Sequence, residues 1–263
     1  MTRPPLPAAF LQTPIAHRAL HDATQGRAEN SPGAVAAAAA AGYGVEIDLQ
    51  PSADGEAMVF HDRTLDRMTD ATGAVRARTA AELEQIALRG GRDTIPRLAR
   101  ILELVDGRVP LLIELKDQAH ADGPGPLESA AARALAGYSG PAAVMSFAPG
   151  AVAQCAKVAP DIARGLVTCA FDAAQAPGLA EPDRHALRDI TAFDAVGASF
   201  ISHDARDLDR SRVAQLRAAG WPVLCWTVTS ATEEKAARRH ADNITFESYL
   251  PALDRGRDGS TSA

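Results

Sequence analysis

The sequence has few cysteines, few aromatic residues and no long apolar run. Its three cysteines, Cys155, Cys169 and Cys225, are odd in number and widely spaced, which argues against a disulfide framework and favours free thiols in a reducing compartment. The longest run of small apolar residues, "AVAAAAAAGYG", is mostly alanine and too short to span a bilayer, and residues 1–20 lack the apolar core of a signal peptide. We therefore expect a cytoplasmic protein without a stable membrane anchor.

Positive charge is also scarce, because 27 Lys and Arg residues stand against 33 Asp and Glu residues and the net charge is −6. This balance argues against non-specific binding to nucleic acid or to anionic membranes, although a local basic pocket for a phosphate is compatible with it. A chain of 263 residues is long enough to bury a sizeable core in one domain. We expect a small molecule as the partner, and the composition does not indicate an oligomeric state.

Short apolar runs alternate with alanine- and charge-rich stretches along the whole chain. Eight runs are predicted to be strands, and several are apolar throughout, as is typical of strands covered on both faces: "PIAHR", "GVEIDLQ", "PLLIELK", "AAVMSF", "IARGLVT", "ASFISH", "PVLCWTV" and "NITFES". Eight strand–helix units predict a closed (β/α)8 TIM barrel, here with a small insertion after the second strand. An open doubly wound sheet is the alternative, but no GxGxxG motif follows the first run. We expect one domain, with the barrel over roughly residues 12–253 and short flexible N- and C-terminal tails.

Helix signals lie between these runs. Thr79 and Glu82, and again Ser230 and Glu233, have the spacing of a capping box. The alanine-rich stretch that follows residue 30 has high helix propensity and is expected to end at Gly42.

Acidic residues occur within two of the predicted strands. Glu46 and Asp48 are separated by one residue, so their side chains share one face of a strand, and Glu114 and Lys116 share a face in the same way. Carboxylates at the mouth of a barrel suit a hard divalent cation such as Mg²⁺ or Ca²⁺. The simpler alternative is a structural glutamate paired with Lys or Arg inside the barrel. Lys116 could contact a substrate phosphate or offset the local negative charge.

Two histidines end apolar runs in matching positions. His17 ends "IAH", with Arg18 directly after it, and His61 ends "AMVFH", with Asp62 directly after it. Two imidazoles facing each other across a scissile bond could divide the roles of general acid and general base, and the Arg18 guanidinium suits phosphate oxygens. A single histidine at a strand end is more often structural, so this hypothesis depends on the whole group.

The chain resembles the glycerophosphodiester phosphodiesterase family in five segments, which occur in the family's order and cover nearly the whole chain: "IAHR", "AENSPGAVAAAAAAGYGVEIDLQPSADGEAMVFHDRTLDRMTDATG", "IPRLARILELV", "LLIELK" and "WPVLCWTV". The resemblance implies a metal-dependent barrel hydrolase. It implies that His17 and His61 are the catalytic pair and that Glu46, Asp48 and Glu114 are the metal ligands. It further implies that Arg18 and Lys116 contact the phosphate and that Trp226 lines the pocket. For Trp226 a place in the barrel core is an equal alternative.

The chain departs from the family pattern around the predicted site. Ala19 stands where the family usually has Gly, which matters only if that position needs a positive φ. The loop between residues 18 and 29 is longer than usual and contains His21 and Asp22, which we expect to have a loop role. Ala28 replaces a proline, and "TFES" near the final strand replaces the usual Thr-Asp. The family's acidic-amide pair is present as residues 29–30 and is expected to shape the loop and cap the helix after it.

Several other polar residues are expected to be outside the chemistry. Ser146 has no adjacent base, so we expect it at most to line the pocket, and His203 at a strand end is a weaker candidate for the same place. His120, His185 and His240 have polar surroundings and are expected to be solvated.

These features together predict metal-dependent hydrolysis of glycerophosphodiesters to glycerol 3-phosphate and an alcohol, a reaction of glycerol and lipid metabolism. Two alternatives stay open: a lysophospholipase D-like activity on the same scaffold, and a catalytically silent barrel that binds phosphorylated ligands. The sequence does not decide the alcohol, the cation, or whether water attacks directly or opens a cyclic phosphate.

Overall fold

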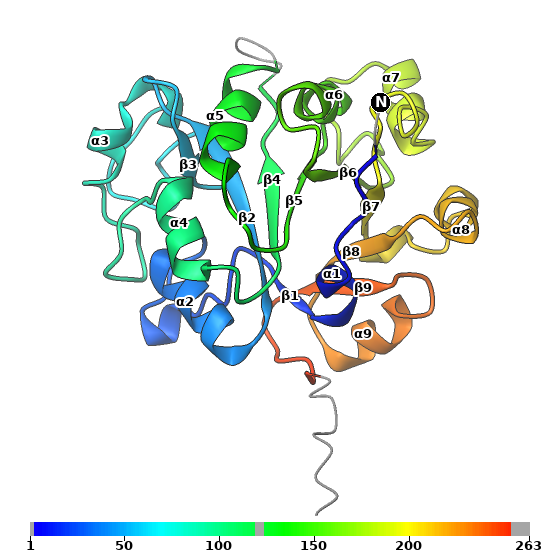
Figure 1. Cartoon of the computed structure of the whole chain (residues 1–263), viewed down its shortest axis with the longest axis horizontal. Coiled ribbons are helices and arrows are strands. Elements are labelled where there is room, and N and C mark those ends of the chain that lie inside the picture. The colour runs from blue at the N-terminus through cyan, green and yellow to red at the C-terminus, as the bar shows by residue number, and fades with distance from the viewer. Residues whose placement is uncertain (1–2, 119–123, 254–263) are drawn as a thin grey trace, which may run out of the picture.

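Parallel strands close into a barrel in the computed structural model, which describes residues 3–118 and 124–253 (Figure 1). Within these residues the barrel comprises eight strands: β1 (Ile15–Ala16), β2 (Gly44–Pro51), β4 (Leu111–Leu115), β5 (Ala142–Ser146), β6 (Ala163–Thr168), β7 (Phe200–Asp204), β8 (Val223–Val228) and β9 (Asn243–Phe246). Strand β1 pairs with both β9 and β2, which closes the barrel. The predicted TIM barrel and its eight strands are confirmed.

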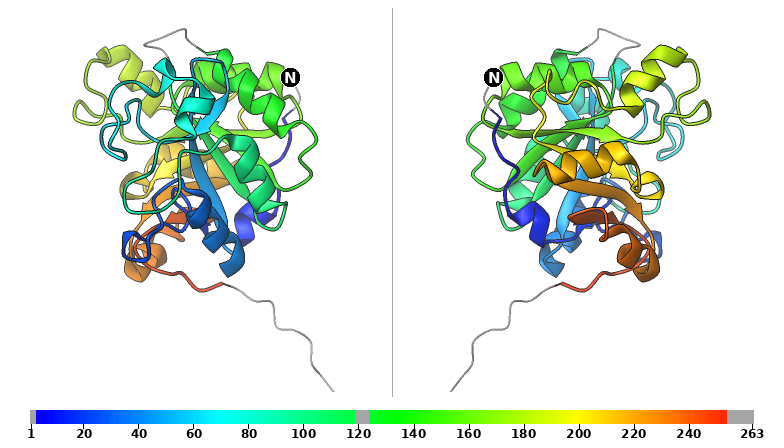
Figure 2. Two further views of the ribbon diagram at one scale, coloured as in Figure 1. Left: turned by 90° about the vertical axis from the view of Figure 1, so that its left-hand side faces the viewer. Right: turned by 90° about the vertical axis from the view of Figure 1, so that its right-hand side faces the viewer.

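Helices surround the barrel on its outside, as the two side views show (Figure 2). They are α2 (Pro32–Ala41), α4 (Leu98–Val105), α5 (Pro126–Leu135), α6 (Pro149–Val158), α7 (Glu181–Arg188), α8 (Ser211–Ala218) and α9 (Ala231–Ala237). Alternate strand residues face opposite sides: Val45 and Ile47 pack in the core between strands and helices, whereas Leu112 and Phe200 pack inside the barrel. In the part of the chain that the structure describes, no helix has the length and apolarity needed to cross a membrane.

The predicted helix caps are present, with one difference. Ser31 Oγ accepts from the Ala34 N–H at the start of α2, and Gly42 ends that helix at φ 86°. The Thr79–Glu82 capping box is complete, although its helix α3 (Ala80–Leu83) is a single turn. At α9, Ser230 accepts from the Glu233 N–H, but the Glu233 carboxylate accepts from the Thr229 N–H instead of closing the box.

The insertion between β2 and β4 has a small core of its own. Strand β3 (Ala57–Val59) runs antiparallel to β2 and is followed by η2 (Val75–Ala77) and α3. Met58, Phe60, Leu83 and Ile95 are among the residues buried in this core. The insertion therefore forms a packed support for His61, which directly follows Phe60.

The N-terminal segment is packed, so the prediction of a flexible tail before residue 12 is wrong for residues 3–11. Helix α1 (Ala9–Gln12) places Phe10, which is 0% exposed, in the core inside the barrel. The Asn243 side-chain amide donates to the Phe10 carbonyl oxygen at 2.8 Å, which fixes the segment to the start of β9. Phe10 closes the amino-terminal end of the barrel. The predicted C-terminal tail, residues 254–263, lies outside the described residues.

The three cysteines are free and buried, as predicted. Burial raises the pKa of the Cys155 thiol to about 12 and that of Cys225 to about 12. Neither thiol would be a thiolate near neutral pH, so neither is suited to be a nucleophile.

Replacing Phe10 by alanine is expected to lower the free energy of unfolding by about 3–5 kcal/mol, because a fully buried aromatic ring is lost from the end of the barrel. Leu11, which is 37% exposed, is the matched control, and Leu11→Ala is expected to change stability by no more than about 0.5 kcal/mol. Denaturant unfolding measures both values. Equally small changes in the free energy of unfolding for the two variants would contradict the role of Phe10 in closing the barrel.

Candidate active site

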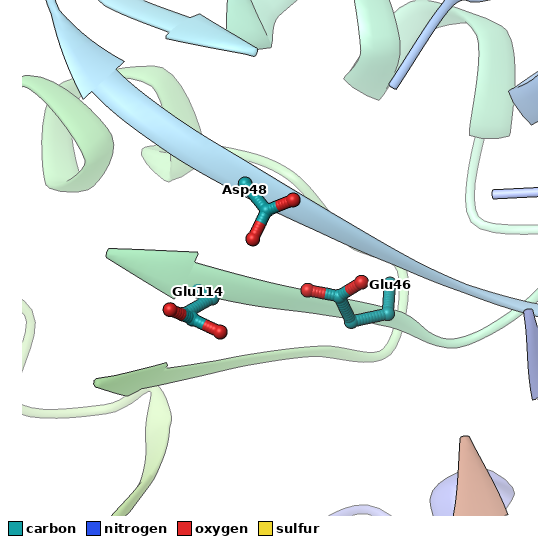
Figure 3. A group of neighbouring side chains, drawn as sticks. All are labelled: Glu46, Asp48 and Glu114. Atoms are coloured by element: carbon teal, nitrogen blue, oxygen red, sulfur yellow. The ribbon is translucent and has the colours of Figure 1, made fainter. Parts of the chain in front are cut away.

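Three carboxylates on two neighbouring strands of the barrel converge (Figure 3). Glu46 and Asp48 lie on β2 and Glu114 on β4, where Asp48 and Glu114 are direct neighbours in the strand register. One oxygen from each lies within 4.8 Å of the others, and all three residues are buried. The predicted sharing of a face is therefore observed, and the three residues form an all-oxygen group that could hold a divalent cation.

Burial and the charges of neighbouring carboxylates disfavour the ionised form of Glu46 and Glu114. Burial, and then the charges of Asp48 and Glu114, raise the pKa of Glu46 well above its usual value. Burial also raises the pKa of Glu114, against the opposing effect of Lys116. Three buried carboxylates need positive charge, so the set fits a hard divalent cation.

Lys116 supplies part of that positive charge. Its Nζ lies 2.6 Å from Asp48 Oδ1 and 2.6 Å from Glu114 Oε1. For Asp48, burial is outweighed by Lys116, His61 and Arg18, so its pKa lies well below the usual range. Lys116 thus offsets carboxylate charge, one of the two roles considered from the sequence.

The loop after β1 aligns the carboxylates. The Arg18 backbone N–H donates to Glu46 Oε2 at 2.8 Å, and its guanidinium donates to Glu29 at 3.0 Å. Asn30 donates from Nδ2 to Asp48 Oδ2 at 2.8 Å and accepts from the Asp48 N–H at 3.1 Å. The prediction that Asn30 caps the helix is wrong, since Ser31 is the cap and Asn30 instead orients Asp48.

Ala19 has a φ of 67°, so the position usually held by Gly does need a left-handed backbone. For a residue with a side chain this conformation costs about 1–2 kcal/mol. The Ala19 side chain is buried with the residue only 2% exposed, and burial of one methyl group is worth about 0.8 kcal/mol. The two effects partly offset each other, which explains how the chain tolerates alanine here.

Each of the two predicted histidines is held by a carboxylate through Nδ1. His17 Nδ1 lies 2.6 Å from Glu247 Oε2, and His61 Nδ1 lies 2.6 Å from Asp62 Oδ1. Because a carboxylate only accepts, each ring carries its proton on Nδ1 when neutral, and Nε2 remains free for another partner. Burial, and then the Lys116 charge, lower the pKa of His61.

Arg67 links the insertion to the loop after β1. Its guanidinium donates to Asp62 Oδ2 at 2.5 Å and to Glu29 Oε1 at 2.6 Å. Glu29 in turn accepts from Arg18. Arg67 and Glu247 were not predicted from the sequence, and the sequence signal for Glu247 is its place in "TFES", where the family pattern changes.

Trp226 lies on β8, which β9 separates from β1. Its indole N–H donates to the Ser202 carbonyl oxygen at 3.1 Å, and its ring packs against Phe147 with centroids 5.5 Å apart. Phe147 also packs against Phe171 at 6.2 Å. The structure therefore places Trp226 in an aromatic cluster on a different part of the barrel wall from the carboxylates.

The other polar candidates have structural partners or lie at the surface. Ser146 donates to the Leu115 carbonyl oxygen at 2.7 Å, and the fully buried His203 contacts Thr168 Oγ1 at 2.7 Å and the Asp207 carbonyl oxygen at 3.1 Å. His185 and His240 are exposed, as expected, whereas His120 lies outside the described residues.

Known proteins share this architecture. A phosphodiesterase from Oleispira antarctica, solved in complex with the product sn-glycerol 3-phosphate, superposes with a TM-score of 0.72 at 25% identity, over 90% of this chain and 94% of that one. A glycerophosphodiester phosphodiesterase from Thermotoga maritima shares the fold, with a TM-score of 0.68 at 18% identity over 89% of this chain and 94% of that one.

Sequence comparison leads to the same group of proteins. The chain is 26% identical to YhdW of Bacillus subtilis over 210 residues, which is 76% of this chain and 79% of that protein. It is 35% identical to the glycerophosphodiester phosphodiesterase of Bacillus altitudinis over 79 residues, 28% of this chain and 32% of that enzyme. The sequence model of the glycerophosphoryl diester phosphodiesterase family matches residues 17–245. The chain belongs to the glycerophosphoryl diester phosphodiesterase family.

Proposed function

We propose that the protein hydrolyses glycerophosphodiesters to glycerol 3-phosphate and an alcohol in a reaction that depends on a divalent cation held by Glu46, Asp48 and Glu114. The observation that carries this proposal is the buried group of three carboxylates. Family membership and the product-bound Oleispira structure support the substrate class.

The all-oxygen ligand set suits either Mg²⁺ or Ca²⁺. A cation bound there would act as a Lewis acid and offset the negative charge that develops on the phosphoryl group. Lys116 now bridges two of the carboxylates. A cation that neutralised the charge of the carboxylates would leave the Lys116 ammonium group available to a phosphate oxygen. The Arg18 guanidinium is the second candidate for that contact.

His17 and His61 would divide the proton transfers. One imidazole removes a proton from the nucleophile, and the other donates a proton to the departing alcohol oxygen as its bond to phosphorus breaks. The nucleophile is either water or the adjacent glycerol hydroxyl, whose cyclic product water then opens. Both routes consume one water molecule and give the same products. The carboxylates on the two Nδ1 atoms support this role because they keep both Nε2 atoms free.

Activity on lysophospholipids is the second candidate, and the aromatic cluster of Phe147, Phe171 and Trp226 is the feature that favours it. The cluster could contact an apolar part of a substrate. We nevertheless expect kcat/KM for glycerophosphocholine to exceed that for lysophosphatidylcholine by at least about tenfold, since this apolar surface is small. Assays of both compounds, with lysophosphatidylcholine kept below its micelle-forming concentration, measure the ratio, and a reversed ratio would favour the lysophospholipase D-like alternative.

Addition of Mg²⁺ or Ca²⁺ to chelator-treated protein is expected to raise the melting temperature. At 100 times the dissociation constant the gain is about 2.7 kcal/mol, or roughly 5–10 °C for a domain of this size. Glu46→Gln is expected to abolish most of this shift, because it removes one ligand charge. Glu103→Gln is the matched control, as the Glu103 side chain is 68% exposed on α4. An unchanged shift in Glu46→Gln would place the cation elsewhere.

His17→Ala and His61→Ala are each expected to lower kcat by about 10²–10⁴-fold, because each removes a proton-transfer group. Both variants are expected to keep the cation-induced rise in melting temperature. Release of glycerol 3-phosphate from glycerophosphocholine, with and without cation, measures the activity. Full activity in either variant would remove that histidine from the proposed mechanism.

A further inference from the structure

Glu247 lies between two imidazoles at the mouth of the barrel. Its Oε2 atom is 2.6 Å from His17 Nδ1 and 3.8 Å from His21 Nε2. The side chains of Glu247, His17 and His21 are 32%, 18% and 29% exposed, so the contacts are partly shielded from water. Two segments that are far apart in the sequence, residues 17–21 and residue 247, therefore meet at one carboxylate oxygen.

The strand register explains why Glu247 meets His17. Strands β1 and β9 pair in parallel, with Ala16 opposite Phe246, so residues 17 and 247 leave the barrel side by side. The backbone N–H of His17 donates to the Phe246 carbonyl oxygen at 2.9 Å, and the backbone N–H of Glu247 donates to the Val228 carbonyl oxygen at 3.0 Å. The barrel fixes the backbone of both residues, so their side chains are held close to each other.

His21 comes from the lengthened loop after β1. Its backbone N–H donates to the Ala19 carbonyl oxygen at 2.9 Å, which turns the loop back over the barrel mouth. Among the described residues, the ion-pair partners of Glu247 are His17 and His21. Asp62 contacts His61 in the same way, but its other ion-pair partner is Arg67. The two histidine–carboxylate pairs are thus alike, but only the His17 pair includes a further imidazole.

We propose that Glu247 is a positioning residue that fixes the ring and the Nδ1–H tautomer of His17, and that His21 holds the Glu247 carboxylate in place. This inference rests on the proposed role of His17 in proton transfer. The hydrogen bond from His17, together with the nearby His21 ring, keeps the pKa of Glu247 well below its usual range, so it remains an acceptor near neutral pH. A carboxylate that only accepts excludes the tautomer in which Nε2 carries the sole proton.

The test compares Glu247→Gln and Glu247→Asp in the cation-loaded full-length protein, with glycerophosphocholine as substrate. Glu247→Gln is expected to lower kcat by about 100-fold or more, since loss of the orienting carboxylate costs on the order of 10⁴-fold in a serine-protease triad. KM is expected to change by less than about threefold, because Glu247 does not bind substrate. Glu247→Asp retains the charge and is expected to recover at least about tenfold of the lost kcat.

A double variant separates positioning from a general structural effect. In a His17→Ala background, Glu247→Gln is expected to cause little further loss, because the group that it positions is already absent. The cation-induced rise in melting temperature checks that each variant retains a folded carboxylate site. His21→Gln is expected to lower kcat less than Glu247→Gln does, because His21 acts through Glu247.

Three results would overturn the inference about Glu247: a kcat for Glu247→Gln within threefold of the parent, a change confined to KM, or a full additional loss in the His17→Ala background. An unaltered kcat in His21→Gln would remove the supporting role of His21. Failure of the proposed function has a different signature, because the parent protein would then be inactive with every cation or His17→Ala would be fully active.

Discussion

Mutual repulsion among three buried carboxylates is the constraint on which the rest of the site depends. Glu46, Asp48 and Glu114 are brought together by strand pairing, and their charges are only partly offset by Lys116. The loop after β1 adds backbone and amide donors, from Arg18 to Glu46 and from Asn30 to Asp48. The remaining deficit of positive charge is what makes the group suitable for a divalent cation.

The two faces of strands β2 and β4 have different roles. Residues facing outward, such as Ile47 and Ile113, pack against the helices, whereas the three carboxylates lie on the inward faces, and β4 changes from apolar to charged along its inward face. On β4 this change occurs between Leu112 and Glu114, two residues apart on one face. The amino-terminal end is closed by Phe10, so the polar mouth lies opposite an apolar, packed base.

The strands and the carboxylates could be predicted from the sequence because their signals are local: apolar runs, and acidic residues two positions apart. The contact between His17 and Glu247 could not, because the two residues are 230 positions apart and meet only when β1 closes the barrel against β9. The packing of the segment before residue 12 could not be predicted, because one aromatic residue among prolines does not reveal what it packs against. The positive φ of Ala19 could be raised only as a possibility, from the Gly that the family usually has there, because alanine itself gives no signal for a left-handed backbone.

The link formed by Arg67 has a consequence for how this scaffold can diverge. His61 and Asp62 belong to an insertion with its own core, yet Arg67 connects that insertion to Glu29 in a loop that follows a different strand. Exchange of either segment alone would remove the contact between Arg67 and Glu29, although Arg67 would keep Asp62 and Glu29 would keep Arg18 as partners. In grafts between relatives, the ion pair between Arg67 and Glu29 would therefore be kept only where the insertion and the first loop are transferred together.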